Sequence, residues 1–415
     1  MVYTKITDNL EFYGSSNPKE LIEKYGSPLY VYNESILRTR IREMKSFLSY
    51  KNFTVNYSAK ANSNVEILKI VKDEGLHVDA VSMGEIYVEK KIGFDSKEIF
   101  FVCNNINKEE MLYAIENNVL MSVDSLSQLE MYGKLNKGGK IAIRFNPGIG
   151  TGHHEHVVTG GKKTKFGVDP VFIPEVKEVL KKYELDLVGI NQHLGSLFME
   201  GSSYIKGINS LLYIAKQFEN LKFVDLGGGF GIPYYKHENE TRLNLINLGI
   251  KVDKVIKEWV SNYSNKDIEI KIEPGRYISA EMGVLIGEVT AIKTNYGKKY
   301  IGTDIGFNNL MRPIMYSAHH DVEIYRDRRD DTVLSSYEEV TIVGNICESG
   351  DIIAKEAFLP EIKENDIIGV LDAGAYGFSM ASNYNNRLKP AEVLIKTDGS
   401  VELIRKRETI DMFMP

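Results

Sequence analysis

The segment VNYSAKANSNVEILKIVKDEGLHVDAVS (55–82) holds two short β-rich runs on either side of a helical pattern. The β-rich runs are VNYSAK (55–60) and HVDAVS (77–82). Between them, NVEILKIVKDEG (64–75) places its apolar residues at helical spacing and leaves a charged outer face. A strand, a helix and a second strand in this order are typical of a parallel sheet with crossover helices. The segment therefore predicts an α/β fold.

The same alternation continues to about residue 280. The further β-rich runs are IFFVCN (99–104), LMSVDS (120–125), IAIRFN (141–146), LVGINQH (187–193), KFVDLG (222–227) and IEIKIEP (268–274). Helical patterns such as EEMLYAIENN (109–118) and VFIPEVKEVLKKY (171–183) separate them. Eight strand-helix units predict a closed (β/α)8, TIM-like barrel over residues 28–280. An open doubly wound sheet is the alternative, because one sequence does not give the order of the strands.

After residue 280 the pattern changes to alternating strands separated by Gly, Asn and Asp turns. The runs are GVLIGEVTAI (283–292), EEVTIVGNICESG (338–350), NDIIGVLDAGAYG (365–377) and AEVLIKT (391–397). We expect a C-terminal antiparallel β-sandwich or β-barrel domain over residues 281–415. Residues 1–27, with VYTKI and EFYG, could add strands to it.

Composition narrows the class of protein. The 415 residues are 43% apolar and 26% charged, as in a folded protein, and their number suits two domains. A net charge of -6 without a long basic block argues against nucleic acid as a partner. No secretory signal and no stretch of about 20 apolar residues is present, so we expect no membrane contact and a cytoplasmic location. Two cysteines, Cys103 and Cys347, fit a reducing compartment.

Reactive side chains gather at the C-terminal ends of the predicted strands, where barrel enzymes carry their active sites. They are Lys60, Asp79, Arg144, His193 and Glu273. A lysine at a barrel mouth can lose its proton and attack an aldehyde. A lone lysine is far more often a solvated surface residue, and only the surrounding constellation favours the chemical role.

Two motifs in this set suggest a phosphorylated ring as ligand. DLGGGFGI (225–232) offers unhindered backbone N–H groups to a phosphate, although its spacing is not a dinucleotide fingerprint and a tight turn is the alternative. EPGR (273–276) places a carboxylate where it could keep a pyridine nitrogen protonated, or it is a turn flanked by an ion pair. His193 could lie against a flat ring, although a lone histidine is more often structural.

Two other motifs are open to more than one interpretation. In CESGD (347–351), Cys347 is a candidate proton donor if it is exposed, and otherwise inert packing. In TGHHEHVVTGGKKTKFG (151–167), His153, His154 and His156 match no strong metal-ligand spacing. We therefore predict no metal and interpret this segment as a loop beside the active site.

Eight motifs occur in the order typical of one enzyme family. They are YSAKAN (57–62), DAVSMGEI (79–86), TGG with KFG (159–167), QHLGS (192–196), DLGGGFG (225–231), EPGR (273–276), CESGD (347–351) and DAGAYG (372–377). On them the sequence resembles the diaminopimelate decarboxylases, whose wider family includes ornithine and arginine decarboxylases and, more distantly, alanine racemase. The resemblance covers nearly the whole chain. It implies a pyridoxal 5'-phosphate-dependent enzyme that converts meso-2,6-diaminopimelate, a small amino acid, to L-lysine and carbon dioxide.

The resemblance also implies roles for individual residues. Lys60 would hold the cofactor, His193 would stack on its ring and Glu273 would pair with its nitrogen. The implied cofactor set is completed by Asp79, Arg144, Ser196, Gly228, Gly229, Gly275, Arg276 and Tyr376. The implied substrate-binding set is Arg276, Arg312, Tyr316, Glu348 and Tyr376. Cys347 would return a proton to the substrate carbon.

In the family that the sequence resembles, Cys347 and Glu348 would reach the cofactor from a second subunit, which implies a homodimer with shared active sites. An arginine-rich distal pocket favours a dicarboxylate substrate through bidentate pairing. Two alternatives remain open at this point. One is a related decarboxylase or racemase acting on lysine- or ornithine-like amino acids, and the other is a non-catalytic regulator on the same fold.

Overall fold

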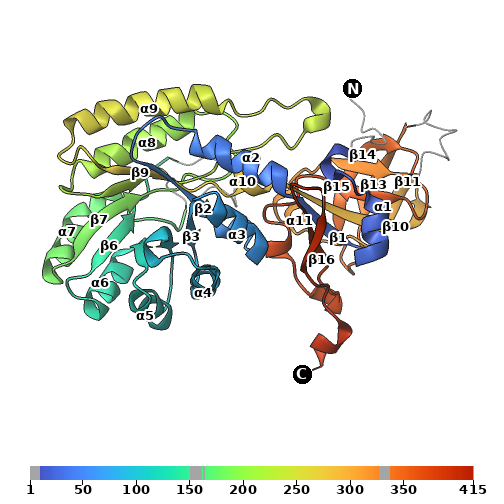
Figure 1. Cartoon of the computed structure of the whole chain (residues 1–415), viewed down its shortest axis with the longest axis horizontal. Helices are drawn as coiled ribbons and strands as arrows, with labels where there is room; N and C mark the ends of the chain where they lie inside the picture. Colours follow the sequence, from blue (N-terminus) through green and yellow to red (C-terminus); the bar gives the residue numbers. More distant parts are fainter. Residues whose placement is uncertain (1–9, 150–160, 162–163, 327–336, 415) are drawn as a thin grey trace. The chain divides into compact units, whose positions relative to one another are not determined.

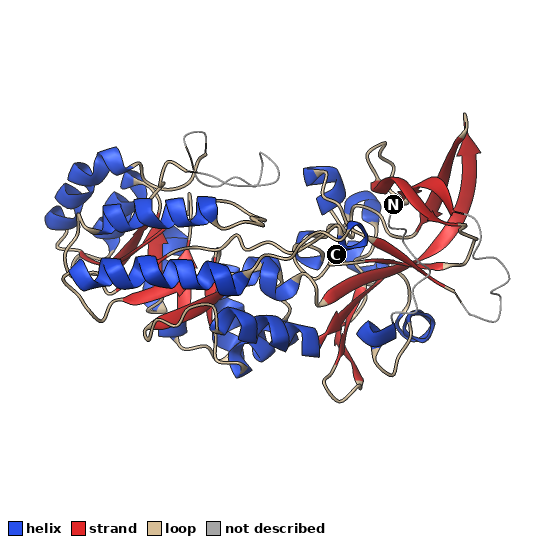
Figure 2. Cartoon of the chain, turned by 90° about the horizontal axis from the view of Figure 1, so that it is seen from above, coloured by secondary structure: helices blue, strands red, loops and turns tan. Residues whose placement is uncertain are grey.

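The computed structural model describes residues 10–149, 161, 164–326 and 337–414, and the chain divides into two compact units (Figure 1). We call Arg40–Ile232 with Arg242–Tyr277 the barrel unit. The rest, namely the chain up to Thr39, Pro233–Thr241 and Ile278 onward, is the sheet unit. Helices enclose the strands of the barrel unit, whereas the sheet unit consists mainly of strands (Figure 2).

The barrel unit contains a closed barrel of parallel strands in chain order. Its strands are β2 (Phe53–Ser58), β3 (His77–Ala80), β4 (Ile99–Val102), β5 (Leu120–Val123), β6 (Lys140–Arg144), β7 (Asp186–Asn191), β8 (Phe223–Asp225) and β9 (Glu269–Ile272). Closure is made by β2, which pairs with both β3 and β9. Each strand overlaps one of the eight predicted runs. The predicted barrel is therefore confirmed, and the open doubly wound sheet is excluded.

Helices surround these strands (Figure 1). They are α3 (Val65–Asp73), α4 (Met83–Ile92), α5 (Lys108–Glu116), α6 (Leu126–Leu135), α7 (Ile173–Lys182), α8 (Ser202–Ala215) and α9 (Leu245–Asn262). Several begin at a capping residue shortly after a strand. The Ser82 hydroxyl accepts from the Glu85 N–H, and Asn107 and Glu110 form a reciprocal capping box. These caps determine where α4 and α5 begin, so the connections after β3 and β4 are short.

The sheet unit contains a nine-stranded, mainly antiparallel sheet within its described residues. Its strands are β1 (Leu29–Asn33), β10 (Gly283–Asn295), β11 (Lys298–Thr303), β12 (Val322–Tyr325), β13 (Tyr337–Val343), β14 (Ile352–Pro360), β15 (Ile367–Val370), β16 (Ala391–Ile395) and β17 (Val401–Arg405). The order β14-β13-β11-β10-β1-β16-β17 branches at β10, which also pairs with β15. The separate β-domain is confirmed, with parallel pairing at β1–β16 and β11–β13.

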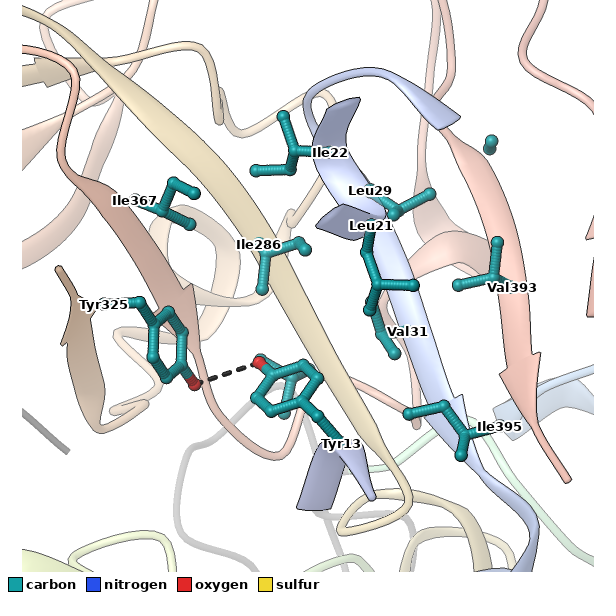
Figure 3. Close-up of a cluster of buried hydrophobic side chains, with 12 residues drawn as sticks. Tyr13, Leu21, Ile22, Leu29, Val31, Ile286, Tyr325, Ile367, Val393 and Ile395 are labelled. Carbon is teal, nitrogen blue, oxygen red and sulfur yellow. Dashed lines mark hydrogen bonds between the residues drawn. The ribbon is translucent and has the colours of Figure 1, made fainter. Parts of the chain in front are cut away.

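A cluster of buried side chains closes one side of this sheet (Figure 3). Helix α1 (Pro18–Tyr25) contributes Leu21 and Ile22, which pack with Ile286 of β10 and residues of β1 and β16. Tyr13 and Tyr325 lie edge to face in the same cluster, and the Tyr13 hydroxyl donates to the Tyr325 oxygen at 3.0 Å. The N-terminal segment is thus part of the core of the sheet unit.

The N-terminal residues differ in detail from the sequence-based expectation. EFYG was expected to add a strand, but Leu10–Tyr13 is a 3₁₀ helix, and VYTKI lies outside the described residues. The strand that joins the sheet is β1, which the 28–280 range had assigned to the barrel. Leu29, Tyr30, Val31 and Tyr32 are buried between β10 and β16, so packing places this segment in the sheet unit. None of the described helices is long and apolar enough to cross a bilayer.

Candidate active site

Lys60 lies directly after the first barrel strand. Strand β2 ends at Ser58, and the 3₁₀ helix η2 (Ala59–Ala61) carries Lys60 with a half-buried side chain. Its positive charge lowers the pKa of Asp79 and of Glu273, partly offsetting the effect of their burial. The same charge helps to lower the pKa of His193. The amine therefore lies within electrostatic reach of side chains from three other strand ends.

Three buried carboxyl groups lie at this end of the barrel and interact with one another. Burial raises the pKa of Asp79, raises that of Asp225 to about 7, and raises that of Glu273 well above its usual range. The Asp225 and Asp79 charges push the Glu273 pKa further in the same direction. Asp79 accepts from the Ser58 hydroxyl at 2.7 Å, and Asp225 accepts from the Gly227 N–H at 2.9 Å. So many buried acids favour a cationic ligand.

Arg144 ends strand β6 and is 8% exposed. Burial lowers the pKa of its guanidinium, while the Glu273 and Asp124 charges raise it. The guanidinium lies 4.6 Å from the centre of the Phe166 ring. Its Nη2 has no hydrogen-bond partner among the described residues. Arg144 thus brings a second cation to the same end of the barrel.

His193 presents a neutral ring. Burial lowers its pKa well below the usual range, and the charges of Lys60 and Arg144 lower it further. Its Nδ1 accepts from the Gly228 N–H at 3.3 Å and lies 3.9 Å from a Glu273 carboxylate oxygen. An uncharged imidazole held from the backbone is suited to packing against a flat ligand.

The glycine run after β8 allows a close backbone approach. A Cβ on Gly228 would lie 2.0 Å from the Glu273 carbonyl oxygen, and one on Gly227 would lie 2.2 Å from that of Gln192. Gly229 has a φ of 102°, a backbone conformation that residues other than glycine rarely adopt. No residue other than glycine fits these positions without moving the neighbouring backbone.

Arg276 follows the EPGR turn and starts the short helix α10 (Arg276–Ser279). It is 6% exposed, and its Nη2 and Nε donate to the Ser196 hydroxyl at 2.9 and 3.3 Å. The preceding Gly275 packs closely on the Lys60 loop, because a Cβ there would lie 3.0 Å from the Cβ atoms of Ser58 and Ala61. A guanidinium, a hydroxyl and the glycine backbone together are suited to an anion.

The remaining predicted residues belong to the sheet unit. Arg312 and Tyr316 are the first and last residues of helix α11 (Arg312–Tyr316), and Arg312 is 1% exposed. Tyr376 is half-buried in the DAGAYG turn, where its φ is 55°. Cys347 and Glu348 are exposed after strand β13.

The CESGD loop that carries Cys347 is held from three sides. Asp351 accepts from the N–H groups of Phe307 and Ile346, each at 2.7 Å. The Cys347 N–H donates to the Asn385 side chain at 2.8 Å. The Tyr384 hydroxyl donates to Glu348 at 2.6 Å. The loop is exposed, yet its conformation is determined by these contacts.

The structure thus brings two sets of predicted residues together, each within its own unit. The barrel unit gathers Lys60, Asp79, Arg144, His193, Ser196, Gly228, Gly229, Glu273, Gly275 and Arg276. The sheet unit carries Arg312, Tyr316, Cys347, Glu348 and Tyr376. His153, His154 and His156 lie outside the described residues, and within those residues no group of side chains suits a metal ion.

Sequence reasoning missed Asp225, Asp124 and Ser58 as members of the barrel-mouth network. Asp225 and Asp124 interact electrostatically with Glu273 and Arg144, respectively. Both aspartates end predicted strands, in KFVDLG and LMSVDS. An ionisable residue at the C-terminal end of an apolar strand was the signal that could have identified them.

The barrel mouth fits pyridoxal 5'-phosphate. Glu273 Oε1 is buried without a hydrogen-bond partner among the described residues, and a protonated ring nitrogen would satisfy it. The closely approached glycine backbone, Ser196 and Arg276 would suit the phosphate, and Lys60 could supply an amine to the aldehyde. All the parts that this cofactor requires are present.

Comparison with known proteins also indicates a pyridoxal phosphate-binding barrel. The family model for the pyridoxal binding domain of pyridoxal-dependent decarboxylases matches residues 34–280. A diaminopimelate decarboxylase from Methanothermobacter thermautotrophicus is 38% identical over 95% of this chain and 92% of its own length. One from Aquifex aeolicus is 33% identical over 99% of this chain and 96% of its own length.

Solved structures give the same result. The crystal structure of diaminopimelate decarboxylase from Helicobacter pylori, complexed with L-lysine, matches with a TM-score of 0.86 and 31% identity, over 95% of this chain and 98% of that one. The chain therefore belongs to the diaminopimelate decarboxylase family of pyridoxal phosphate-dependent enzymes.

Proposed function

We propose that this enzyme removes carbon dioxide from meso-2,6-diaminopimelate to give L-lysine. The observation that carries the proposal is the barrel mouth itself, where the Lys60 amine lies within electrostatic reach of buried Glu273, whose Oε1 has no hydrogen-bond partner in the described part of the chain. The names of the relatives supply the substrate, since they are diaminopimelate decarboxylases and one is complexed with L-lysine.

Bound pyridoxal phosphate supplies an electron sink for the charge that loss of carbon dioxide leaves on the substrate carbon. Glu273 would hold a proton on the ring nitrogen, because its buried Oε1 has no hydrogen-bond partner among the described residues. His193 would lie against the ring with an uncharged imidazole. Lys60 would be the amine that holds the aldehyde, and Asp79 lies within reach to balance its charge.

Substrate choice depends on the groups that meet the far end of the molecule. Arg276, Arg312 and Tyr316 bind the distal carboxylate, Glu348 binds the distal amino group, and Tyr376 contacts both cofactor and substrate. Lysine and ornithine lack a carboxylate at that end. Paired arginines therefore favour the dicarboxylate, because a guanidinium and a carboxylate form two parallel hydrogen bonds.

Cys347 returns the proton to the substrate carbon. We propose that it acts in a homodimer, in which Cys347 and Glu348 reach the cofactor of the second subunit and the sheet unit completes a shared active site. The exposure of both side chains supports this, because an exposed reactive pair on an anchored loop is available to another chain. We also propose a cytoplasmic location, in keeping with the reduced cysteines.

A carbon dioxide release assay tests the proposal. The purified enzyme with added cofactor is given meso-diaminopimelate, D- and L-lysine, ornithine and arginine at equal concentrations. We expect release from diaminopimelate alone at a substantial rate. Release from lysine or ornithine instead would make the protein a related decarboxylase, and racemisation without release would make it a racemase. A colourless, inactive protein would indicate a regulator that has lost the chemistry.

A further inference from the structure

Arg312 is a charged residue in an almost closed environment within the sheet unit. Its side chain is 1% exposed, and its guanidinium lies 4.5 Å from the centre of the Tyr234 ring. Its Nη1 lies 2.5 Å from Nε2 of His320, a residue that is itself 2% exposed. A buried guanidinium keeps one orientation only where its neighbours hold it.

The two ring nitrogens of His320 have different partners. Nδ1 lies 2.7 Å from the Leu371 carbonyl oxygen, which only accepts hydrogen bonds, so Nδ1 carries the hydrogen. In the neutral ring Nε2 then has a lone pair, and it accepts from Arg312. The Tyr234 ring meets the imidazole edge to face at 5.2 Å. Leu371 and Tyr234 thus determine both the tautomer and the plane of the ring.

We infer that His320 is a positioning residue for the substrate carboxylate, acting through Arg312. This rests on the proposed function, in which Arg312 binds the distal carboxylate. A guanidinium binds a carboxylate through two parallel hydrogen bonds only when the two groups are nearly coplanar and one N–H edge points at the ligand. His320 contacts one guanidinium nitrogen, and the guanidinium lies over the Tyr234 ring, so its orientation is held by two neighbours. A lysine at position 312 would have no such plane to be held.

The test compares two ligands that differ by a carboxylate. L-lysine carries one and cadaverine has none, and binding of each is followed by titrating the absorbance of the bound cofactor. His320→Asn retains a donor for Leu371 but removes the acceptor for Arg312. We expect this substitution to raise the Kd of L-lysine by about 10-fold to 100-fold, as for loss of a charge-assisted hydrogen bond. The Kd of cadaverine should change by less than about twofold.

Two further variants separate positioning from packing. His320→Gln places a side-chain oxygen near the position of Nε2, and we expect it to restore L-lysine binding to within about threefold of wild type. In an Arg312→Lys background, His320→Asn should cause no further loss of L-lysine binding, because the histidine acts only through the guanidinium. His319→Asn is the matched control. His319 contacts Asp321 and Tyr235 instead, and its replacement should leave the binding of both ligands unchanged.

The outcomes are distinct. The inference would be overturned if His320→Asn weakened the binding of L-lysine and of cadaverine equally, or if it left the binding of L-lysine unchanged. If His320→Asn does not fold, a tenfold loss of L-lysine binding in folded His320→Gln would overturn it as well. If wild type itself shows no preference for L-lysine over cadaverine, it is the proposed role of Arg312 that fails, before His320 is tested.

Discussion

The barrel mouth and the CESGD loop present their reactive groups in opposite ways. The barrel unit buries them, with Asp79, Glu273 and Arg144 each less than a tenth exposed and with shifted pKa values. The sheet unit leaves Cys347 and Glu348 exposed on a loop. In the barrel, burial and neighbouring charges decide the protonation state of each group. In the CESGD loop, backbone and side-chain anchors decide where the groups are.

This difference predicts different consequences of mutation. Changing a buried barrel group alters the charges felt by all the others, because they interact over short distances in a medium of low dielectric constant. Changing an exposed group in the sheet unit removes its own function and leaves the barrel intact.

The largest effect should come from Lys60→Ala. The barrel mouth would lose the amine that we propose holds the cofactor, and with it the cation that offsets Asp79 and Glu273. We expect turnover below detection and loss of the visible absorbance of the lysine-bound cofactor. Lys69→Ala is the control, since Lys69 is an exposed lysine paired with Glu66 on helix α3. Wild-type absorbance and turnover in Lys60→Ala would contradict the assignment of the whole site.

The second largest effect should come from Cys347→Ala, which should lower turnover without changing cofactor binding. Loss of a positioned proton donor is expected to lower kcat by about 100-fold to 10,000-fold. The absorbance spectrum should stay as in wild type, because no described barrel contact involves Cys347. Cys103→Ala serves as the control, since Cys103 is buried and donates to the Ser122 carbonyl oxygen. If Cys347→Ala altered the absorbance spectrum, a group in the sheet unit would affect cofactor binding, contrary to this prediction.

A buried acid away from the predicted site should control the pH dependence of stability. Glu89 on α4 is fully buried, and neither carboxyl oxygen has a hydrogen-bond partner among the described residues. Burial, with the Glu85 and Asp79 charges, raises its pKa to about 10. Its contribution to stability is therefore fully present below its usual pKa of about 4.3 and is lost as pH rises towards 10.

Glu89→Gln should remove this pH dependence. Between pH 5 and pH 8 the wild type should lose about 4 kcal/mol more unfolding free energy than the variant, measured by urea denaturation. Glu109→Gln, at an exposed position of helix α5, is the control and should keep the wild-type pH profile. Parallel profiles for Glu89→Gln and wild type would show that Glu89 is ionised and paired in the folded protein.

Much of the barrel could be predicted because its signal is local. Each strand is a short apolar run, and the reactive residues lie at strand ends, so chain position alone indicated Lys60, His193 and Glu273. The placement of β1 could not be predicted in this way. Its pairing with β10 and β16 joins segments more than 250 residues apart, as in the register Leu29 with Ile286 and Ala391.

The features that escaped prediction depend on three-dimensional neighbours. Glu89 follows Glu85 at helical spacing in a run that reads as an ordinary amphipathic helix, and only packing shows that it is buried. The contact of Arg312 with His320 has no sequence signature either, because a polar pair eight residues apart is most often exposed. Burial and tautomer decide its role, and neither is visible in the residue order.

The smallest effect should come from Tyr384→Phe, which tests the anchors of the CESGD loop. The variant loses the hydroxyl that donates to Glu348 but keeps the ring that stacks on Phe307 at 5.7 Å. A hydrogen bond at an exposed site contributes about 1 kcal/mol, so KM for diaminopimelate should rise about fivefold with kcat and absorbance unchanged. Tyr296→Phe, at a fully exposed turn, is the matched control. A fall in kcat as large as that of Cys347→Ala would mean that Tyr384 determines the position of the cysteine, and the exposed loop would then depend on its neighbours as strongly as the buried barrel groups do.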